Sequence, residues 1–279
     1  MPELPEVETV RRGIEDTVIG RRISEVKVLG RRTVRRQSPA ELTDRLLGRR
    51  FVAARRRGKF LLLSLDDGAV LVVHLRMTGQ LLFFGDRDKP PLAAHTHLTV
   101  ALDDGSELRF VDPRTFGEWF VTSSLDDRGE PLELEHLGRD PLLEGLPSAY
   151  LASRFAGRRA RLKALLTDQS VIAGIGSIYA DEICFRAKLR PDRLGGSLTP
   201  AELASLARAA RSVLGEAVKS RGSSLRDKRY RDLAGELGSY QGRHAVYDRA
   251  GEPCPRCGRA VVRLKIGARS AYCCEGCQF

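Results

Sequence analysis

Four cysteines near the end of the chain constrain its fold more than any other feature. Cys254 and Cys257 are followed, after sixteen intervening residues, by Cys274 and Cys277. The spacing C-x2-C-x16-C-x2-C is typical of two turns that each supply two thiolates to one tetrahedral zinc ion. Four protein ligands leave no open position for water, so the expected Zn2+ ion is structural. Residues 250–279 are therefore predicted to form a zinc-bound β-hairpin.

The charge of the chain is large and unevenly distributed. Its 279 residues carry a formal net charge of +11, and an acidic stretch over residues 61–150 separates two basic regions. A positive surface attracts nucleic acid because each neutralised phosphate releases counterions. We therefore favour a nucleic-acid partner over a merely solvated surface. The apolar runs are too short for a membrane span and no signal peptide opens the chain, so a cytoplasmic protein without a membrane partner is expected.

Short β-rich runs fill most of the first 130 residues. One helical segment precedes them: residues 5–20 carry apolar side chains at helical spacing, with glutamates in the first turn. The runs that follow are separated by turn signals, and two of these signals are Asp-Asp-Gly, which favours hairpins. Many short strands at this spacing predict a sandwich or a barrel.

Beyond residue 130 the pattern becomes helical. Residues 148–169, 177–189 and 199–222 have helical periodicity, and the last run opens with the capping box T-P-A-E. Cys184 falls on a helical pattern and is expected in the core. The polar residues 223–249 predict a mobile loop.

Six motifs in one order make the whole chain resemble a known family. They are PELPEVE at the start, RRGKFLL at 56–62, HLRMTG at 74–79, DPRTFG at 112–117, DQSVIAGIGSIYADE at 168–182, and the cysteine hairpin. Together they resemble the formamidopyrimidine-DNA glycosylase family, bacterial repair enzymes for oxidised purines. The related endonuclease VIII proteins usually open differently after Pro-Glu, so the opening favours the purine branch.

The pattern and the resemblance together imply an α+β fold in three parts. We expect a catalytic β-sandwich domain flanked by helices over 1–130, a helix-two-turn-helix domain over 131–249, and a zinc-finger hairpin over 250–279. Within the second part, the loop 223–249 corresponds to the segment that covers the extruded base in the family.

Pro2 and Glu3 are the expected centre of the chemistry. If Met1 is removed, Pro2 becomes a secondary amine, and an α-amino group titrates near ~7.7–8.0, so part of it is neutral at working pH. Its attack on the sugar would form a cationic iminium, from which the phosphates leave by elimination. Glu3 can relay protons. Without the resemblance, Pro2 and Glu3 would be residues that merely start a helix.

The resemblance adds Lys59 and Arg269 to the catalytic group as contacts of the phosphates beside the lesion, and it implies that Lys59 takes part in acid–base steps. Lys59 is expected on a strand, between a glycine and an aromatic residue, and Arg269 near the tip of the zinc hairpin. A guanidinium suits bidentate contact with phosphate. His95 is expected to be a further backbone contact. Taken alone, Lys59 would be a strand-edge lysine and His95 a surface histidine.

Extrusion of a nucleotide leaves a hole that must be filled. The resemblance assigns this filling to Met77, Arg114 and Phe116. A flexible methionine can plug the gap, a phenylalanine can wedge a base step, and an arginine can bond the orphaned base. Without the resemblance, Met77 and Phe116 would be interpreted as core residues.

Ser177 follows the G-I-G turn of the helix-two-turn-helix motif. Glycines there let the backbone approach a phosphate, and a helix N-terminus follows. The family usually has Asn at this position, where it contacts the phosphate of the lesion. Serine is shorter, so weaker DNA binding or a water-bridged contact is expected. Arg76 and Thr115 also stand where many members have Gly and Arg.

The sequence thus predicts a bifunctional enzyme of base-excision repair. It would remove 8-oxoguanine and formamidopyrimidines from damaged double-stranded DNA and cleave the strand by β,δ-elimination through a Schiff base on Pro2. A monomer in the bacterial cytoplasm, associated with the nucleoid, is expected. Two alternatives stay open: an oxidised-pyrimidine glycosylase of the endonuclease VIII branch, and a zinc-containing DNA-binding protein without catalysis.

Overall fold

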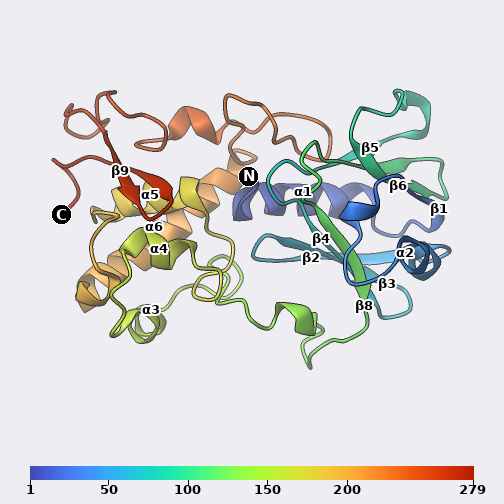
Figure 1. Ribbon diagram of the computed structural model, residues 1–279, viewed down its shortest axis with the longest axis horizontal. Coiled ribbons are helices and arrows are strands. Elements are labelled where there is room, and N and C mark those ends of the chain that lie inside the picture. Colours follow the sequence, from blue (N-terminus) through green and yellow to red (C-terminus); the bar gives the residue numbers. More distant parts are fainter. The chain divides into compact units, whose positions relative to one another are not determined.

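The computed structural model describes residues 1–279, apart from the side chain of Asp88, and the chain forms two compact units (Figure 1). Unit 1 comprises Met1–Glu135 and Ser220–Ser239. Unit 2 comprises His136–Lys219 and Tyr240–Phe279. Among the described residues, no helix combines the length and the apolarity that crossing a membrane requires.

Unit 1 contains two four-stranded antiparallel sheets, so the predicted β-sandwich is confirmed. One sheet has the order β1-β6-β7-β5 and the other has the order β2-β3-β4-β8. The strands are β1 (Ile23–Val28), β2 (Phe51–Arg57), β3 (Phe60–Leu65), β4 (Val70–His74), β5 (Gln80–Phe84), β6 (Thr96–Leu102), β7 (Glu107–Val111) and β8 (Glu118–Thr122). The two predicted Asp-Asp-Gly hairpins join β3 to β4 and β6 to β7, with Gly68 at φ +86° and Gly105 at φ +82°.

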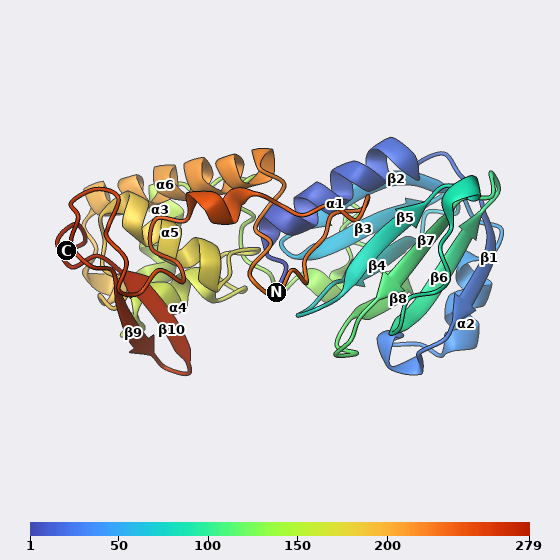
Figure 2. The same ribbon diagram turned by 90° about the horizontal axis from the view of Figure 1, so that it is seen from above.

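Two helices flank these sheets. The predicted first helix is α1 (Leu4–Thr17), whose Val7, Val10 and Ile14 are buried in the core of unit 1. Figure 2 shows α1 running beside β2. The second helix, α2 (Pro39–Leu46), was not predicted.

Residues 220–239 also belong to unit 1. The sequence predicts a mobile polar loop over 223–249, but the structure differs, because Tyr230 and Leu233 are buried in the same core as α1 and the sheets. The backbone N–H of Phe83 donates to the Leu233 carbonyl at 2.9 Å, which ties the segment to β5. Tyr230 and Leu233 therefore anchor the first part of this stretch in unit 1, while Tyr240 and Val246, which are also buried, belong to unit 2.

Unit 2 is helical and ends in a two-stranded hairpin. Its elements are α3 (Ser148–Phe155), α4 (Leu162–Thr167), α5 (Ser177–Ala187), α6 (Pro200–Lys219), β9 (Val262–Ile266) and β10 (Arg269–Cys273). The expected helical run 148–169 is interrupted after α3, where Gly157 has φ +67°. The predicted capping box at the start of α6 is confirmed by Glu202 N donating to Thr199 Oγ1 and Thr199 N donating to Glu202 Oε2.

Short 3-10 helices connect some of these elements. They are η1 (Arg31–Thr33), η2 (Asp86–Asp88), η3 (Leu132–Leu134), η4 (Gly195–Ser197) and η5 (Tyr240–Arg243).

Candidate nucleic-acid interface

Pro2 lies outside the first helix. Helix α1 begins at Leu4 with Glu3 as its N-cap, and Pro5 occupies the second helical position, where proline is well tolerated. The helix-starting role that could have explained Pro2 therefore belongs to Pro5. Glu3 directly follows Pro2 and is only 2% exposed. A carboxyl group thus sits beside the residue that removal of Met1 would make the amino terminus.

The Glu6 carboxylate fixes this amino-terminal segment. Its Oε2 accepts a hydrogen bond from Glu3 N at 2.8 Å, and its Oε1 accepts one from Ser223 N at 2.7 Å. Gly222 has φ +76°, and a Cβ there would lie 2.5 Å from Glu6 Oε1. Glycine at this position lets the backbone come close enough to bond the carboxylate. Segments at the two ends of unit 1 are therefore joined through one side chain, next to Glu3.

Lys59 was expected on a strand, but it lies in a turn. Gly58 and Lys59 form the tight connection between β2 and β3, with Gly58 at φ +57°. The lysine is buried, so it is not a solvated strand-edge residue. Arg56 donates from Nη1 to the Gly58 carbonyl at 3.0 Å and thereby holds the turn from inside.

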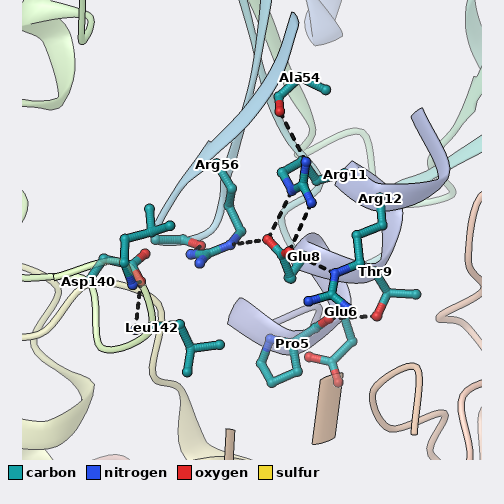
Figure 3. A network of polar contacts seen from close by, with 12 residues as sticks. Pro5, Glu6, Glu8, Thr9, Arg11, Arg12, Ala54, Arg56, Asp140 and Leu142 are labelled. Atoms are coloured by element: carbon teal, nitrogen blue, oxygen red, sulfur yellow. Dashed lines mark hydrogen bonds and ion pairs between the residues drawn. The ribbon is translucent and has the colours of Figure 1, made fainter. Parts of the chain in front are cut away.

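Glu8 connects that turn to α1 (Figure 3). Its carboxylate accepts hydrogen bonds from Arg56 Nε at 3.1 Å and from Arg11 Nε at 3.1 Å. It also accepts one from Arg12 Nε at 3.0 Å, and Arg11 reaches the Ala54 carbonyl on β2. Burial raises the pKa of Glu8, but the hydrogen bonds from Arg11 and Arg12 outweigh it, so the pKa lies below its ordinary value. The helix that carries Glu3 and the turn that carries Lys59 therefore share one ionised group.

Sequence reasoning did not find Glu8 or Arg56. The local signal was Glu8 four residues before Arg12, an ordinary helical pair. Arg56 lies 48 positions from Glu8, so only the folded chain shows that they meet.

Met77 and Phe116 are exposed, at 40% and 48%. The interpretation of these two residues as core is therefore wrong, and both side chains are available to a partner. The Arg114 guanidinium lies 4.8 Å from the centre of the Phe116 ring, so the two side chains form one cation–π pair.

Asp112 joins the loops that carry these residues. Its Oδ1 accepts from the Thr78 hydroxyl, and its Oδ2 accepts from Gly117 N at 2.7 Å. Its own backbone N–H donates to the His95 carbonyl at 3.0 Å. His95 is exposed, as expected of a surface residue. Asp112 therefore ties the Met77 and Phe116 loops together through its buried carboxylate, and the His95 loop through its backbone N–H.

Each of these three loops also holds one residue in the left-handed backbone region. Arg76 has φ +54°, His95 has φ +65° and Thr115 has φ +57°. Such conformations are uncommon for residues other than glycine and cluster at functional sites. Arg76 is held there in part by its own N–H, which donates to Nδ1 of His74 at 2.8 Å.

Ser177 is the first residue of α5 in unit 2, directly after the turn with Gly174 and Gly176. Gly174 has φ +98°, which favours glycine. The side chain of Gln169 spans this turn: its Oε1 accepts from Gly174 N at 2.9 Å, and its Nε2 donates to the Ile175 carbonyl at 2.8 Å. The half-buried Ser177 therefore lies at a helix N-terminus whose preceding turn is fixed by one amide.

Arg269 is the first residue of β10, next to the hairpin tip, as predicted. Its Nη1 donates to the Thr167 hydroxyl at 2.7 Å. Nearby, the buried Lys163 donates to Asp181 Oδ2 at 2.7 Å and to the Ser270 carbonyl at 2.6 Å. Burial raises the pKa of Asp181 to about 7, although the Lys163 charge opposes the shift.

The four predicted cysteine ligands converge. The sulfurs of Cys254, Cys257, Cys274 and Cys277 all lie within 4.8 Å of one another. Cys254 Sγ is 3.9 Å from Cys277 Sγ, and Cys257 Sγ is 3.4 Å from Cys274 Sγ. A tetrahedral ion with metal–sulfur bonds of about 2.3 Å places its sulfurs about 3.8 Å apart, so the donor set fits such an ion.

The two remaining cysteines lie outside this cluster. Cys184 and Cys273 are both fully buried. Cys184 is therefore a core residue, as expected.

The predicted site residues fall into two groups. Unit 1 holds Pro2, Glu3, Lys59, Met77, His95, Arg114 and Phe116, and unit 2 holds Ser177, Arg269 and the four cysteines. Within unit 1, Glu6, Glu8 and Asp112 organise the group. Within unit 2, Gln169 and Thr167 do so.

Three family models match the chain over most of its length. They are the formamidopyrimidine-DNA glycosylase N-terminal domain over residues 1–119, the formamidopyrimidine-DNA glycosylase H2TH domain over 137–229, and a zinc finger found in FPG and IleRS over 251–278. The chain is 44% identical to a formamidopyrimidine-DNA glycosylase of Cereibacter sphaeroides, with all of both chains covered. It is 43% identical to one of Pelotomaculum thermopropionicum, over all of this chain and 99% of the relative.

Solved structures agree with these matches. The MutM (Fpg) protein of Thermus thermophilus superposes with a TM-score of 0.86 at 42% identity, covering 99% of this chain and 98% of that one. The Lactococcus lactis Fpg in complex with DNA containing N7-benzyl-Fapy-dG superposes with a TM-score of 0.89 at 32% identity, covering 99% of each chain.

Proposed function

The chain belongs to the formamidopyrimidine-DNA glycosylase family of DNA-repair enzymes, and from that premise we propose that it excises oxidised purines and then cleaves the strand, with Pro2 as nucleophile. The observation that carries the proposal is the position of Pro2. It precedes α1, whose start is already served by Pro5, and it adjoins the buried Glu3.

The proposed reaction begins after Met1 is removed. The neutral Pro2 nitrogen attacks C1′ of the damaged nucleotide, the bond from C1′ to the base breaks, and the base leaves with its electron pair and a proton. The sugar ring opens to an iminium, which accepts the electron pair of the C2′–H bond as that proton is removed, and the resulting enamine expels the 3′-phosphate in β-elimination. Loss of the C4′ proton then expels the 5′-phosphate in δ-elimination. Glu3 carries protons between the sugar and the leaving groups.

The other residues bind the DNA around this centre. Lys59 and Arg269 hold the phosphates beside the lesion, and Ser177 and His95 add backbone contacts. Met77 and Phe116 fill the space that the extruded nucleotide leaves, and Arg114 bonds the orphaned base. The exposure of all three filling residues supports this assignment.

We further propose that Zn2+ is the ion of the cysteine cluster. Four thiolates at tetrahedral spacing suit zinc, and the ion would fix the hairpin that carries Arg269. We expect a monomer that acts on damaged double-stranded DNA in the bacterial cytoplasm.

Borohydride trapping tests the central step, because reduction of the iminium leaves a permanent link between protein and DNA. We expect the processed chain to be trapped on a duplex with one 8-oxoguanine. A chain with an N-terminal extension should bind this duplex but should not be trapped. Trapping of the extended chain at the normal rate would exclude Pro2 as the nucleophile.

A panel of duplexes separates the alternatives. Faster cleavage at 8-oxoguanine and formamidopyrimidine than at oxidised pyrimidines supports the purine branch, and the reverse order supports the endonuclease VIII branch. Binding without any trapping supports the DNA-binding protein that lacks catalysis.

A further inference from the structure

Helix α4 reaches the zinc hairpin with two side chains from one of its faces. Lys163 and Thr167 are four positions apart and therefore lie on the same side of the helix. Lys163 donates to the carbonyl of Ser270, and Thr167 accepts from the side chain of the preceding residue, Arg269. Figure 2 shows the hairpin beside α4. The lysine thus holds the strand, and the threonine holds the arginine itself.

The Thr167 hydroxyl is oriented before it meets Arg269. A hydroxyl has one proton to donate, and Thr167 Oγ1 donates it to the Lys163 carbonyl at 3.0 Å inside the helix. Its oxygen lone pairs then remain for Arg269 Nη1 at 2.7 Å. The residue is buried, and its branched Cβ limits rotation about χ1. Among the described residues, Thr167 makes the one polar contact seen for the exposed Arg269 side chain, and this bond restrains the direction of the guanidinium.

The same residue is joined to the turn that precedes Ser177. The carbonyl of Thr167 accepts from Gln169 Nε2 at 2.9 Å, and this amide also bonds Gly174 and Ile175. Thr167 therefore contacts Arg269 through its hydroxyl, and its carbonyl is linked to the Ser177 turn by the side chain of Gln169. Both elements are proposed to bind DNA phosphates, so their separation matters for binding.

We propose that Thr167 is a positioning residue, which sets the Arg269 guanidinium at a fixed place relative to the Ser177 turn so that both meet the DNA backbone together. This inference rests on the proposed function of Arg269 as a phosphate contact. It assigns to Thr167 no contact with DNA and no chemical step.

The test compares three threonine variants of the full chain, with the metal bound. Thr167→Val keeps the shape and removes the hydroxyl, whereas Thr167→Ser keeps the hydroxyl. Thr43→Val is the matched control, because the Thr43 hydroxyl makes the same helical bond to the Pro39 carbonyl, at 3.1 Å, in α2. We expect Thr167→Val to weaken binding to an abasic-site duplex roughly three- to tenfold, the loss of a modest hydrogen bond. Thr167→Ser and Thr43→Val should bind within about twofold of the parent.

A double-mutant cycle with Arg269→Ala decides how Thr167 acts. If the threonine works through the arginine, Thr167→Val has no further effect once Arg269 is gone. Arg269→Ala should also reduce the slope of log Kd against log salt by about 0.9, since one phosphate contact is lost. Thr167→Val should shift this slope in the same direction, which a general loss of stability would not do.

The outcomes separate the inference from its premise. The inference would be overturned if Thr167→Val had equal effects with and without Arg269, or if its effect were no larger than that of Thr43→Val. In either case, trapping of the parent protein on 8-oxoguanine DNA would still support the proposed function. An Arg269→Ala variant that binds with unchanged affinity and salt slope would instead remove the premise, and the inference with it.

Discussion

In unit 1, Glu3 and the Lys59 turn rest on α1, whose apolar face is buried in the core of a two-sheet sandwich. In unit 2, Arg269 sits on a two-stranded hairpin, and the apolar cluster beside it is small and includes three of the four metal-site cysteines. A hairpin of two strands is marginally stable by itself. The comparison indicates that the polar contacts of unit 1 rest on a large buried core, whereas Arg269 depends on a small cysteine cluster and a few polar contacts.

Loss of the metal site should show the largest difference between the two units, because it should affect unit 2 and leave unit 1 intact. We expect Cys274→Ser to release the hairpin and to weaken binding to a lesion duplex on the order of a hundredfold, because the proposed phosphate contact of Arg269 would lose its fixed position. Trp119 is the only tryptophan and is fully buried in unit 1, so its fluorescence reports that unit. The thermal transition seen by Trp119 should stay unchanged.

Cys273→Ala is the matched control for this experiment. Cys273 adjoins a ligand but lies outside the cluster, so this variant should keep one metal ion per chain. A shift of the Trp119 transition in Cys274→Ser, but not in Cys273→Ala, would show that unit 1 also depends on the metal.

The corresponding experiment in unit 1 removes a buried charge. The Arg56 side chain is 1% exposed, and Glu8 would lose its partner from β2. We expect Arg56→Met to lower the free energy of unfolding by about 3 kcal/mol, since breaking a buried ion pair leaves its other charge less compensated. Urea unfolding followed by Trp119 fluorescence measures this.

Arg12→Met provides the control, because Arg12 bonds the same carboxylate but is 57% exposed. Its loss should cost less than about 1 kcal/mol. If Arg12→Met and Arg56→Met lowered the free energy of unfolding equally, burial of the ion pair would not be the reason why the Glu8 network stabilises unit 1.

Acid should affect both units through one neutral histidine each. Burial lowers the pKa of His74 to about 3, with the charges of Arg76 and Lys59 adding to the shift, and burial lowers the pKa of His244 to about 4. An unfolded histidine titrates near ~6.5, so below that pH the unfolded chain binds protons that the folded chain does not. Stability should therefore fall as pH drops from about 6.5 toward 3 for His74, and toward 4 for His244, by up to about 1.4 kcal/mol per pH unit for each.

Substitution distinguishes the two contributions. His74→Asn keeps an acceptor for Arg76 N but does not titrate, so the Trp119 transition should become less sensitive to pH over that window. His244→Asn should leave the Trp119 transition as sensitive as before. Urea unfolding at a series of pH values gives both slopes, and an unchanged slope in His74→Asn would contradict the assignment.

Local patterns predicted much of this molecule. The strands of the sandwich follow short β-rich runs between turn residues, and the convergence of the four cysteines follows from their spacing alone. Helix α2 could also have been predicted, since Ser38 and Glu41 form a capping box before it. It was missed because eight residues carry little periodicity. The sequence pattern predicts a strand at Lys59 because β-rich residues follow it, whereas the glycine before it allows the tight turn.

Contacts between distant parts of the sequence could not be predicted. Glu6 meets Ser223 across 217 positions, and Thr167 meets Arg269 across 102. Neither pair leaves a periodic signal, because each depends on how the elements fold together. The candidate DNA-contacting residues were found through motifs, while Glu8, Asp112 and Thr167, which help to hold them in place, emerged only from the structure.

The smallest change that we expect is in the affinity of unit 2 for DNA. Ser177 opens α5 after a turn fixed by Gln169, so a longer side chain there would extend from a rigid support. Ser177→Asn adds an amide that can donate directly to a phosphate, and we expect roughly two- to fivefold tighter binding to an abasic-site duplex. Ser148→Asn is the matched control, since Ser148 is likewise the first residue of a helix, α3, but follows Pro147 and not a glycine turn. Fluorescence anisotropy measures the affinity of both variants for this duplex. Tighter binding by Ser177→Asn alone would show that the short Ser177 side chain limits the affinity for DNA. Equal affinities of Ser177→Asn and the parent would show that the turn backbone already makes the contact.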